Sequence, residues 1–424
     1  MNPNYIITVF FLLLSSKANL FFKYDIFWFL LILYLVWFAF EKKLILKREV
    51  NFFIVFTSSY LAYVLFRNVT YNHLSSEYLL SDILFLFKYL LVSFLFCLVL
   101  KEKAIEYIIR VVRDLTVISF FFYAMQLVGL GSLLYSFMHL FDSLNNIGIP
   151  GYTNDFIFTF TQGRHDFRNS GFVWEPGAFG CFLIITLMFH FFRNDFTFDK
   201  TAKIFIVGII TTLSTTNYLA LFILLFLMYR YRVRRFNFAI LLLIPLGAIL
   251  FMTVPILGEK ITQTMNDDSK SLEDMQNLSR YYTLHNVQIP LNRFASMTFL
   301  YDNFGAHLIM GISNKYDEIV NQKFNVNISN GIFDFLAKFG VIGLLFLIYR
   351  YLQFCKAYLV RNELAFYCLV ILMVLAFGEP ILFLPICMIF LFLPISGIDY
   401  EHLWSERNEG ELVPDPTNYK YGNI

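Results

Sequence analysis

Long apolar runs recur along this sequence, and they restrict its fold more than any other feature. Three of them, Tyr24–Phe40, Asp82–Leu100 and Leu115–Leu134, approach the ~20 residues that a helix needs to cross a bilayer. Lipid offers no hydrogen bonds to the backbone, so only helices and closed barrels can span it. The runs show no alternation of period two, which barrel strands require. We therefore expect an all-α polytopic membrane protein.

The charge content supports the same class. Only 15% of the residues are charged and 58% are hydrophobic, whereas average soluble domains carry about 25% charged residues. The net charge of +2 does not indicate nucleic-acid binding, because the Lys and Arg residues lie between the apolar runs. The five cysteines include no C-x-x-C pair, so neither a disulfide framework nor a zinc site is predicted. No P-loop, dinucleotide fingerprint, H-E-x-x-H or calcium loop occurs, so we expect no cofactor and no metal.

About twelve spans fit the apolar pattern. They cover about 4–22, 24–40, 51–66, 82–100, 114–134, 174–192, 201–214, 217–229, 237–257, 332–349, 363–378 and 380–397. The stretch 201–229 could be one long helix or two short ones. We favour two, with Ser214-Thr215-Thr216-Asn217 as the bend, because this keeps Lys203 and the cluster Arg230–Arg235 on one side.

Basic residues gather in alternate short loops, which indicates an orientation. With the N-terminus inside, the inner loops carry Lys42, Lys43, Lys47 and Arg48, then Lys101, Lys103, Arg110 and Arg113, then Arg193, Lys200 and Lys203, then Arg230, Arg232, Arg234 and Arg235, and finally Arg350, Lys356 and Arg361. The short outer loops hold Lys17, Lys23 and Arg67. The positive-inside rule therefore places the two large segments, 135–171 and 258–331, outside. We expect one transmembrane domain over 1–397 and a cytoplasmic tail over 398–424.

The densest group of polar residues, Gly163–Gly177, joins the first large segment to the sixth span. Within it, Glu175-Pro176 suits a helix start, because Pro fits the first turn and an acid meets the positive helix end. In one interpretation this is a capped helix whose arginines, Arg164 and Arg168, are solvated or paired. In the other, Arg168 binds a phosphate whose lipid tail lies in the bilayer, since its planar charged fork suits that task.

The second large segment and the spans after it add further candidates. Arg280, Tyr281, His285 and Arg293 could form a local phosphate site, or make exposed ion pairs and ordinary loop contacts. Asp334 and Lys338 lie one helical turn apart and can pair, although an intramembrane charge normally faces a cavity or a partner. Pairing and a functional role for Lys338 both remain open. We interpret Glu379-Pro380 as a helix start in preference to a functional site.

Three stretches resemble one known family. Arg168-Asn-Ser-Gly-Phe-Val-Trp-Glu-Pro-Gly-Ala-Phe-Gly180 resembles the R-x-x-G-x-x-x-E/H-P motif of O-antigen polymerases and ligases. Ser214–Asn217 fits the polar bend that follows in that family, and Ile312–Leu345 is similar to its closing outer loop and helix. Ser329 precedes Asn330 where related ligases show His, which favours the polymerases. The R-x10-G pattern of some polymerases is absent at Arg280 and Arg293.

The resemblance implies a GT-C-like multi-pass fold in a bacterial inner membrane, with the active site facing the periplasm. It implies that undecaprenyl-diphosphate-linked oligosaccharide units are polymerised without a nucleotide sugar, in lipopolysaccharide biosynthesis. Membrane lipids, a chain-length regulator and a flippase would be partners, and nucleic acid would not. The expected catalytic residues are Arg168, Glu175 and Arg280, and the expected substrate-binding residues are Arg164, His165, Tyr281, His285, Arg293, Asn330 and Lys338. An O-antigen ligase and a lipid-linked oligosaccharide flippase or transporter are the alternatives, although transporters usually show repeated halves, which are not visible.

Overall fold

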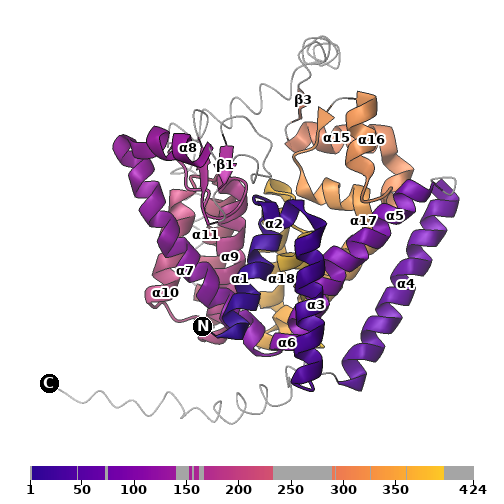
Figure 1. The fold of residues 1–424 in the computed structure, drawn as a ribbon, viewed down its shortest axis with the longest axis horizontal. Helices are drawn as coiled ribbons and strands as arrows, with labels where there is room; N and C mark the ends of the chain where they lie inside the picture. Colours follow the sequence, from indigo (N-terminus) through magenta and orange to yellow (C-terminus); the bar gives the residue numbers. More distant parts are fainter. Residues whose placement is uncertain are drawn as a thin grey trace.

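The computed structural model describes residues 2–44, 46–71, 75–139, 152–154, 157–161, 167–232, 289–291, 293–324, 326–359 and 361–395. These residues are mostly helical, and their long helices run side by side (Figure 1). Within this part of the chain, five helices or continuous helical rods are long and apolar enough to cross a membrane: Lys47–Tyr71, Ser76–Leu100, Lys103–Leu134, Pro176–Arg193 and Gly331–Tyr358. The expected class, a helical multi-pass membrane protein, is confirmed, whereas the number of spans stays a prediction.

The N-terminal part consists of helices that pack along their lengths. Its elements are α1 (Pro3–Ser15), α2 (Leu20–Lys23), α3 (Asp25–Glu41), α4 (Lys47–Tyr71), α5 (Ser76–Phe85), a π-helical turn (Leu86–Leu91), α6 (Val92–Leu100), α7 (Lys103–Met125), a second π-helical turn (Gln126–Leu130) and α8 (Gly131–His139). Asn2 begins α1, because its side-chain oxygen accepts from the Asn4 amide at 3.0 Å and Pro3 fits the first turn.

The remaining elements form the middle and the C-terminal part. They are β1 (Tyr152–Asn154), β2 (Thr159–Thr161), α9 (Pro176–Arg193), α10 (Lys200–Thr211), α11 (Thr215–Arg232), β3 (Ile289–Pro290), α15 (Arg293–Phe304), a 3-10 turn (Gly305–Ile309), α16 (Tyr316–Phe324), β4 (Val326–Asn327), α17 (Gly331–Tyr358), α18 (Asn362–Gly378), α19 (Pro385–Met388) and a last 3-10 turn (Ile389–Leu391). β1 pairs antiparallel with β2, and β3 pairs parallel with β4. The separation of 201–229 into two helices, α10 and α11, is confirmed.

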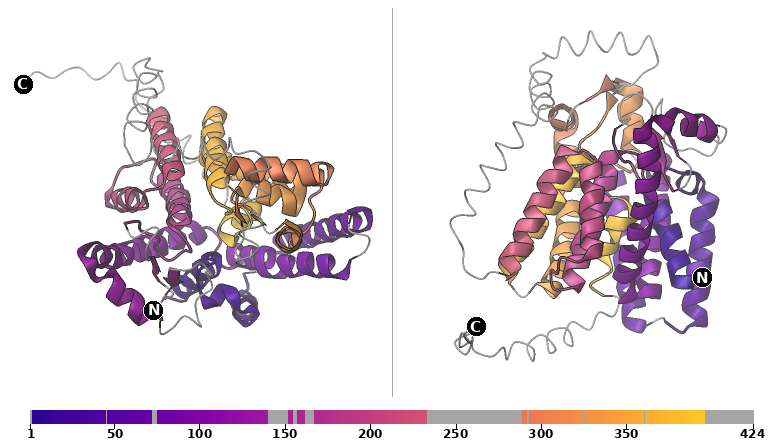
Figure 2. Two further views of the ribbon diagram at one scale, coloured as in Figure 1. Left: turned by 90° about the horizontal axis from the view of Figure 1, so that it is seen from above. Right: turned by 90° about the vertical axis from the view of Figure 1, so that its left-hand side faces the viewer.

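The described parts of the two large segments lie at one end of the bundle, which we call the loop end. Figure 1 shows β1, α8, α15 and α16 together there, and Figure 2 shows the orange α15–α16 region beside the violet α4 and α5. Polar contacts fix this position. Asn314 donates from its backbone amide and from Nδ2 to the Asp82 carboxylate on α5, both at 3.0 Å. The segment between α15 and α16 is thus bound to the helical bundle.

The twelfth predicted span, 380–397, is wrong as a continuous helix. Ile381–Leu393 contains only short turns and the four-residue α19, yet every one of these residues is buried. Pro380, Pro385 and Pro394 explain the breaks, because proline lacks the amide hydrogen that a helix interior needs. Arg350 compensates by donating twice to the Leu391 carbonyl, at 2.9 and 2.8 Å. Irregular backbone is tolerated at membrane depth only where protein surrounds it.

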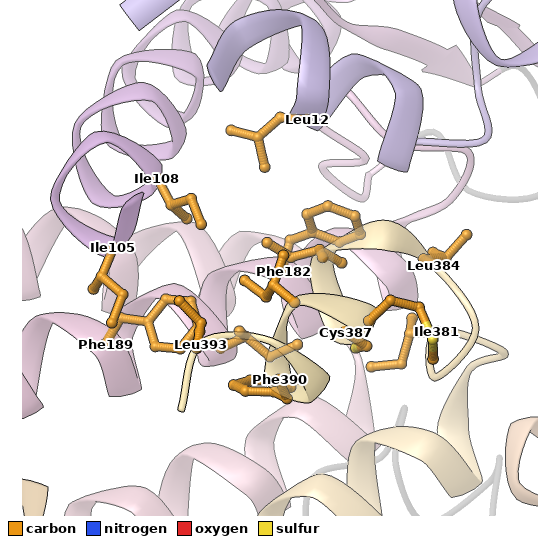
Figure 3. Close-up of a cluster of buried hydrophobic side chains, with 14 of the residues drawn as sticks. Leu12, Ile105, Ile108, Phe182, Phe189, Ile381, Leu384, Cys387, Phe390 and Leu393 are labelled. Atoms are coloured by element: carbon orange, nitrogen blue, oxygen red, sulfur yellow. The ribbon is translucent and has the colours of Figure 1, made fainter. Parts of the chain in front are cut away.

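The surroundings of this segment are the core of the molecule. Figure 3 shows five of its side chains packed among those of α1, α7 and α9: Ile381, Leu384, Cys387, Phe390 and Leu393 against Leu12, Ile105, Ile108, Phe182 and Phe189. All of these side chains are buried. The helix α9 is the central element, because 94% of its 18-residue apolar stretch is buried inside the protein.

Several span boundaries were also wrong. The first span, 4–22, breaks at Ser15, and Lys17 there has a φ of 57°. Three presumed loop cations, Arg110, Arg350 and Arg67, lie within α7, α17 and α4. The predicted spans ended at the first charged residue. These arginines nevertheless continue their helices, and each has a partner: Glu106 for Arg110, the Leu391 carbonyl for Arg350 and Asp82 for Arg67. The span 237–257, the tail 398–424 and much of both large segments lie outside the described residues.

Candidate functional site

The ends of three helices converge at the loop end, around the side chain and backbone of Glu379. A Cβ added to Gly177 on α9 would lie 2.0 Å from the Glu379 Oε1, and one added to Gly331 on α17 would lie 2.2 Å from the Glu379 carbonyl oxygen. Only glycine allows such close approach. The N-termini of α9 and α17 and the C-terminus of α18 therefore meet at one point, where helix N-termini provide partial positive charge.

Arg168 lies beside the end of α10, and its neighbours are held firmly. Its Nε donates to the Thr212 carbonyl at 2.9 Å. The Asn169 amide donates to the Thr211 carbonyl at 2.9 Å, and its Nδ2 donates to Ser119 at 3.1 Å. Gly171 follows with a φ of 51°, where a Cβ would meet the Phe179 ring at 2.5 Å. The motif residues thus hold the half-buried Arg168 at the loop end.

Glu175 begins α9, as the sequence predicted. Its backbone is extended, with a φ of −158°, and Pro176 occupies the first turn. Its carboxylate makes no capping hydrogen bond to the helix. Instead, Oε1 accepts from the Trp174 indole Nε1 at 2.8 Å. The capped-helix interpretation is therefore correct for the backbone and wrong for the side chain, which remains available to the site.

The Glu379 side chain is the buried partner of Glu175, and we call the two groups the carboxyl pair. Glu379 is 7% exposed. Its Oε1 lies 2.0 Å from the position of a Cβ on Gly177, two residues after Glu175, and the two carboxyl groups interact. Nη2 of Arg293 lies 3.7 Å from the Glu379 Oε1. Burial, followed by the charge of Glu175, raises the pKa of Glu379 well above its usual range, while Arg293 and Arg168 oppose this effect. Three predicted site residues, Arg168, Glu175 and Arg293, are thus brought together with Glu379.

Lys338 lies in a separate charged cluster on α17. Its Nζ is 2.8 and 3.0 Å from the two Asp334 oxygens, 3.5 Å from Asp317 and 4.0 Å from the centroid of the Phe383 ring. The predicted pairing with Asp334 is confirmed. A direct role of Lys338 in substrate binding stays a prediction.

Asn330 supports the site through the backbone. Its Oδ1 accepts from the Ile332 and Phe333 amides at 3.1 and 3.3 Å, which begins α17. Its Nδ2 donates to the Arg293 carbonyl at 3.1 Å. The side chain thus joins the start of α17 to α15 and positions Arg293, while contact with substrate stays a prediction. The other predicted residues lie outside the described part of the chain: Arg164, His165, Arg280, Tyr281 and His285.

Sequence reasoning missed two residues near this site. Lys17 lies between α1 and α2, with its Nζ 5.8 Å from the Trp174 ring centroid. It interacts electrostatically with both Glu175 and Lys338. A lone lysine within an apolar run was a usable signal, because such charges rarely lack a role. Glu379 was the second. It follows the end of α18 rather than starting a helix, and nothing in the sequence indicates that it lies beside Glu175.

An apolar cavity of about 330 Å³ lies between α4, the α5–α6 rod and α17. Its lining side chains include Ser59 and Phe56 of α4 and Phe335 and Phe339 of α17. Polar groups close it toward the loop end. Tyr63 donates to the Phe339 carbonyl at 2.9 Å. The cavity can therefore hold an apolar chain, and one of its lining residues, Phe339, directly follows Lys338 in the sequence.

In the part of the chain that the structure describes, no cluster of three or more His, Cys, Asp or Glu side chains could hold a metal ion. The described site consists of carboxyl groups, guanidinium groups and helix ends. Such groups bind anions and transfer protons.

Comparison with known families gives one match. Residues 201–348 match the family model described as O-antigen ligase. No curated protein and no solved structure matches the chain. The matched stretch begins in α10 and ends in α17, so it includes Arg293, Asn330 and Lys338, whereas Arg168 and Glu175 precede it and Glu379 follows it. The match therefore relates this stretch of the chain to the O-antigen polymerase and ligase superfamily.

Proposed function

We propose that this protein is a polysaccharide polymerase that joins undecaprenyl-diphosphate-linked oligosaccharide units at the outer face of the bacterial inner membrane. The observation that carries the proposal is the grouping of Arg168 and Arg293 around the carboxyl pair at the loop end. Two guanidinium groups and two helix N-termini suit a diphosphate. The carboxyl group of Glu175 suits proton transfer. The match of residues 201–348 to a family of membrane enzymes that transfer or ligate glycans supports the same reaction class.

In the proposed reaction, a sugar hydroxyl of one unit attacks the anomeric carbon of another. The new C–O bond forms as the bond to the diphosphate breaks, and the electron pair leaves with the diphosphate. Arg168 stabilises the growing charge, and preorganised charge of this kind usually contributes more to catalysis than any other single effect. Lys338 is occupied by two aspartates, so we assign the second cationic position to Arg293 among the described residues, with Arg280 as the alternative. Glu175 accepts the hydroxyl proton.

The lipid chain of the donor needs an apolar site within the bilayer. We assign this site to the cavity between α4 and α17, because its lining is almost entirely apolar. Only 11% of the 18-residue apolar stretch of α4 is buried. We therefore infer that a lipid chain can reach the cavity from the bilayer, past α4. A chain-length regulator and a flippase remain the expected protein partners.

Replacement of Arg168 tests the function. Arg168→Ala should reduce polymer formation by about 10²-fold or more, the loss seen when a preorganised donor is removed. Arg168→Lys tests whether the planar fork matters beyond the charge. Arg193→Ala is the matched control, because Arg193 lies at the far end of α9 and contacts Glu106 at 3.4 Å. Full polymer from a membrane-inserted Arg168→Ala protein would refute the assignment.

An O-antigen ligase is the second candidate, because the matching family model carries that description. A ligase would use the same donor and a different acceptor. Reconstitution with purified lipid-linked repeat units as the sole substrate separates the two. A polymerase forms chains from these units, whereas a ligase requires an added glycolipid acceptor. A flippase would form no new glycosidic bond in either reaction.

A further inference from the structure

We propose that Glu379 is a positioning residue that shares one proton with Glu175 and sets the protonation state of the group that accepts the hydroxyl proton. The inference rests on the proposed function and adds a residue that neither the sequence motif nor the family match includes. It makes the carboxyl pair, rather than Glu175 alone, the proton-handling unit of the site.

The proximity of the two carboxyl groups carries the inference, because the Glu379 Oε1 lies 2.0 Å from the position of a Cβ on Gly177, two residues after Glu175. Two carboxyl groups can form a hydrogen bond only if one of them holds a proton, because the ionised group has no donor. Like charges this close also raise the pKa of one member. Glu175 and Glu379 come from distant parts of the chain, at the start of α9 and the end of α18. The fold therefore brings them together, rather than local helix geometry.

Burial assigns different tasks to the two groups. Glu379 is 7% exposed, whereas Glu175 is half-buried. Ionisation costs more free energy in the more buried carboxyl group, so we assign the proton to Glu379 before the reaction. The less buried Glu175 is the member that we assign to accept the hydroxyl proton. Its Oε1 is held by the Trp174 indole at 2.8 Å, which fixes the orientation of the carboxylate for proton acceptance.

The surrounding backbone prevents Glu379 from moving away. Its Oε1 occupies the space that a side chain on Gly177 would need, and its carbonyl oxygen occupies the corresponding space at Gly331. Arg293 donates from Nε to the Gly378 carbonyl at 3.1 Å, directly before Glu379. A site in which the partner carboxyl cannot swing out is suited to keeping one proton between two groups.

Three charged side chains act most strongly on Glu379 among the described residues. Glu175 raises the pKa of Glu379, and Arg293 and Arg168 lower it, after burial has raised it most. The thiol of Cys181 on α9 also interacts with Glu379. Below the raised pKa the pair holds one proton and one negative charge. Above it, both groups are ionised, and the second negative charge opposes binding of a diphosphate at Arg168 and Arg293.

The proton balance of the step follows. The acceptor hydroxyl gives its proton to Glu175 as its oxygen bonds to the anomeric carbon, and the electron pair of the broken bond leaves with the diphosphate. The pair then holds two protons and returns one to water after product release. Polymer formation should therefore fall as the pH rises through the pKa of the pair.

The decisive variant is Glu379→Gln in the full-length reconstituted protein. The amide donates to Glu175 at every pH, so it imitates the protonated acid without losing shape. We expect polymerisation within about 10-fold of the natural protein on the acidic side, since general acid-base groups contribute about 10²–10⁴-fold and Glu175 remains. The decline at alkaline pH should disappear. Glu379→Ala should lower the rate about 10²-fold at all pH values, because Glu175 loses its partner.

Glu363→Gln is the matched control, because Glu363 lies in the first turn of the same helix, at its other end. Its pH profile should equal that of the natural protein. A Glu379→Gln profile that keeps the alkaline decline, or that is lowered equally at all pH values, would overturn the inference. If Arg168→Ala abolishes polymer in the same assay, an unexpected Glu379→Gln profile overturns only the role of Glu379. If Arg168→Ala is fully active, the proposed function fails as well.

Discussion

The helices α4 and α9 have the same apolarity and opposite surroundings. The 18-residue apolar stretch of each helix has a mean hydropathy of 1.4, yet 11% of this stretch is buried in α4 and 94% in α9. In a bilayer, lipid is as apolar as a leucine side chain, so apolarity alone does not draw helices together. The comparison teaches that hydropathy identifies a membrane helix, while small residues and polar contacts decide whether it becomes central.

The contacts of each helix illustrate this rule. Gly180 of α9 lies so close to α11 that a Cβ there would be 1.9 Å from the Asn217 Nδ2, and this Nδ2 donates to the Gly177 carbonyl at 2.8 Å. On α4, the buried residues near the loop end are Val64, Arg67 and Asn68. Between the two ends of α4 lies the cavity. The α4 helix is thus anchored by a few polar contacts and α9 by its whole length.

The largest expected difference comes from matched phenylalanine truncations. Phe182 of α9 is fully buried and its ring centroid lies 5.5 Å from that of Phe172, whereas Phe66 of α4 is 61% exposed. Phe182→Ala should lower the free energy of unfolding by about 3–5 kcal/mol, because it removes packing and leaves a cavity. Phe66→Ala should change it by less than about 0.5 kcal/mol. Thermal unfolding in detergent measures both, and equal losses would remove the distinction between the helices.

A smaller effect is expected at the polar anchor of α4. Arg67 is fully buried, pairs with Asp82 of α5 and donates to the Lys338 carbonyl at 2.6 Å. Arg67→Leu should destabilise the protein by about 3 kcal/mol, because it leaves a buried carboxylate without its counter-charge. The double variant Arg67→Leu with Asp82→Leu should recover part of this loss in the same unfolding measurement. If the single variant is as stable as the natural protein, α4 is not anchored in this way.

The smallest effect on stability, with a specific effect on function, is expected at two adjacent serines of α4. Ser58 and Ser59 are both exposed on α4, but only Ser59 is among the residues that line the cavity. Ser59→Trp should fill the cavity and raise KM for the lipid-linked donor about 10-fold, equivalent to about 1.4 kcal/mol, with little change in kcat. Ser58→Trp is the control of equal size and should behave as the natural protein does. Equal kinetics for the two variants would exclude the cavity as the site of the lipid chain.

The parts that sequence reasoning predicted correctly have strong local signals. Glu175-Pro176 marks a helix start by proline geometry, and α9 begins there. The basic cluster that begins in the last turn of α11 favoured a bend near Ser214, and α10 and α11 are two helices. Asp334 and Lys338 are paired, as their spacing of one turn allowed. Each of these features depends on neighbours in the sequence.

The parts that it missed depend on distant contacts. The stretch 380–397 has the composition of a span, and only the packing around Ile381–Leu393 reveals that it is not a helix. Glu379 and Lys17 meet Glu175 through three-dimensional proximity that no spacing encodes. Arg350 was assigned to a loop, because a hydropathy window cannot detect the Leu391 carbonyl to which it donates. The carboxyl pair could therefore be recognised only in the structure.

The buried irregular stretch Ile381–Leu393 has a consequence for biogenesis. A segment that cannot satisfy its own backbone as a helix would expose bare amide and carbonyl groups to acyl chains if it entered the bilayer alone. Several of its partners, among them α1, α6 and α9, are made earlier during synthesis, and the Ser93 hydroxyl of α6 donates to the Pro385 carbonyl at 3.3 Å. Insertion of this stretch must therefore follow assembly of the helices that surround it.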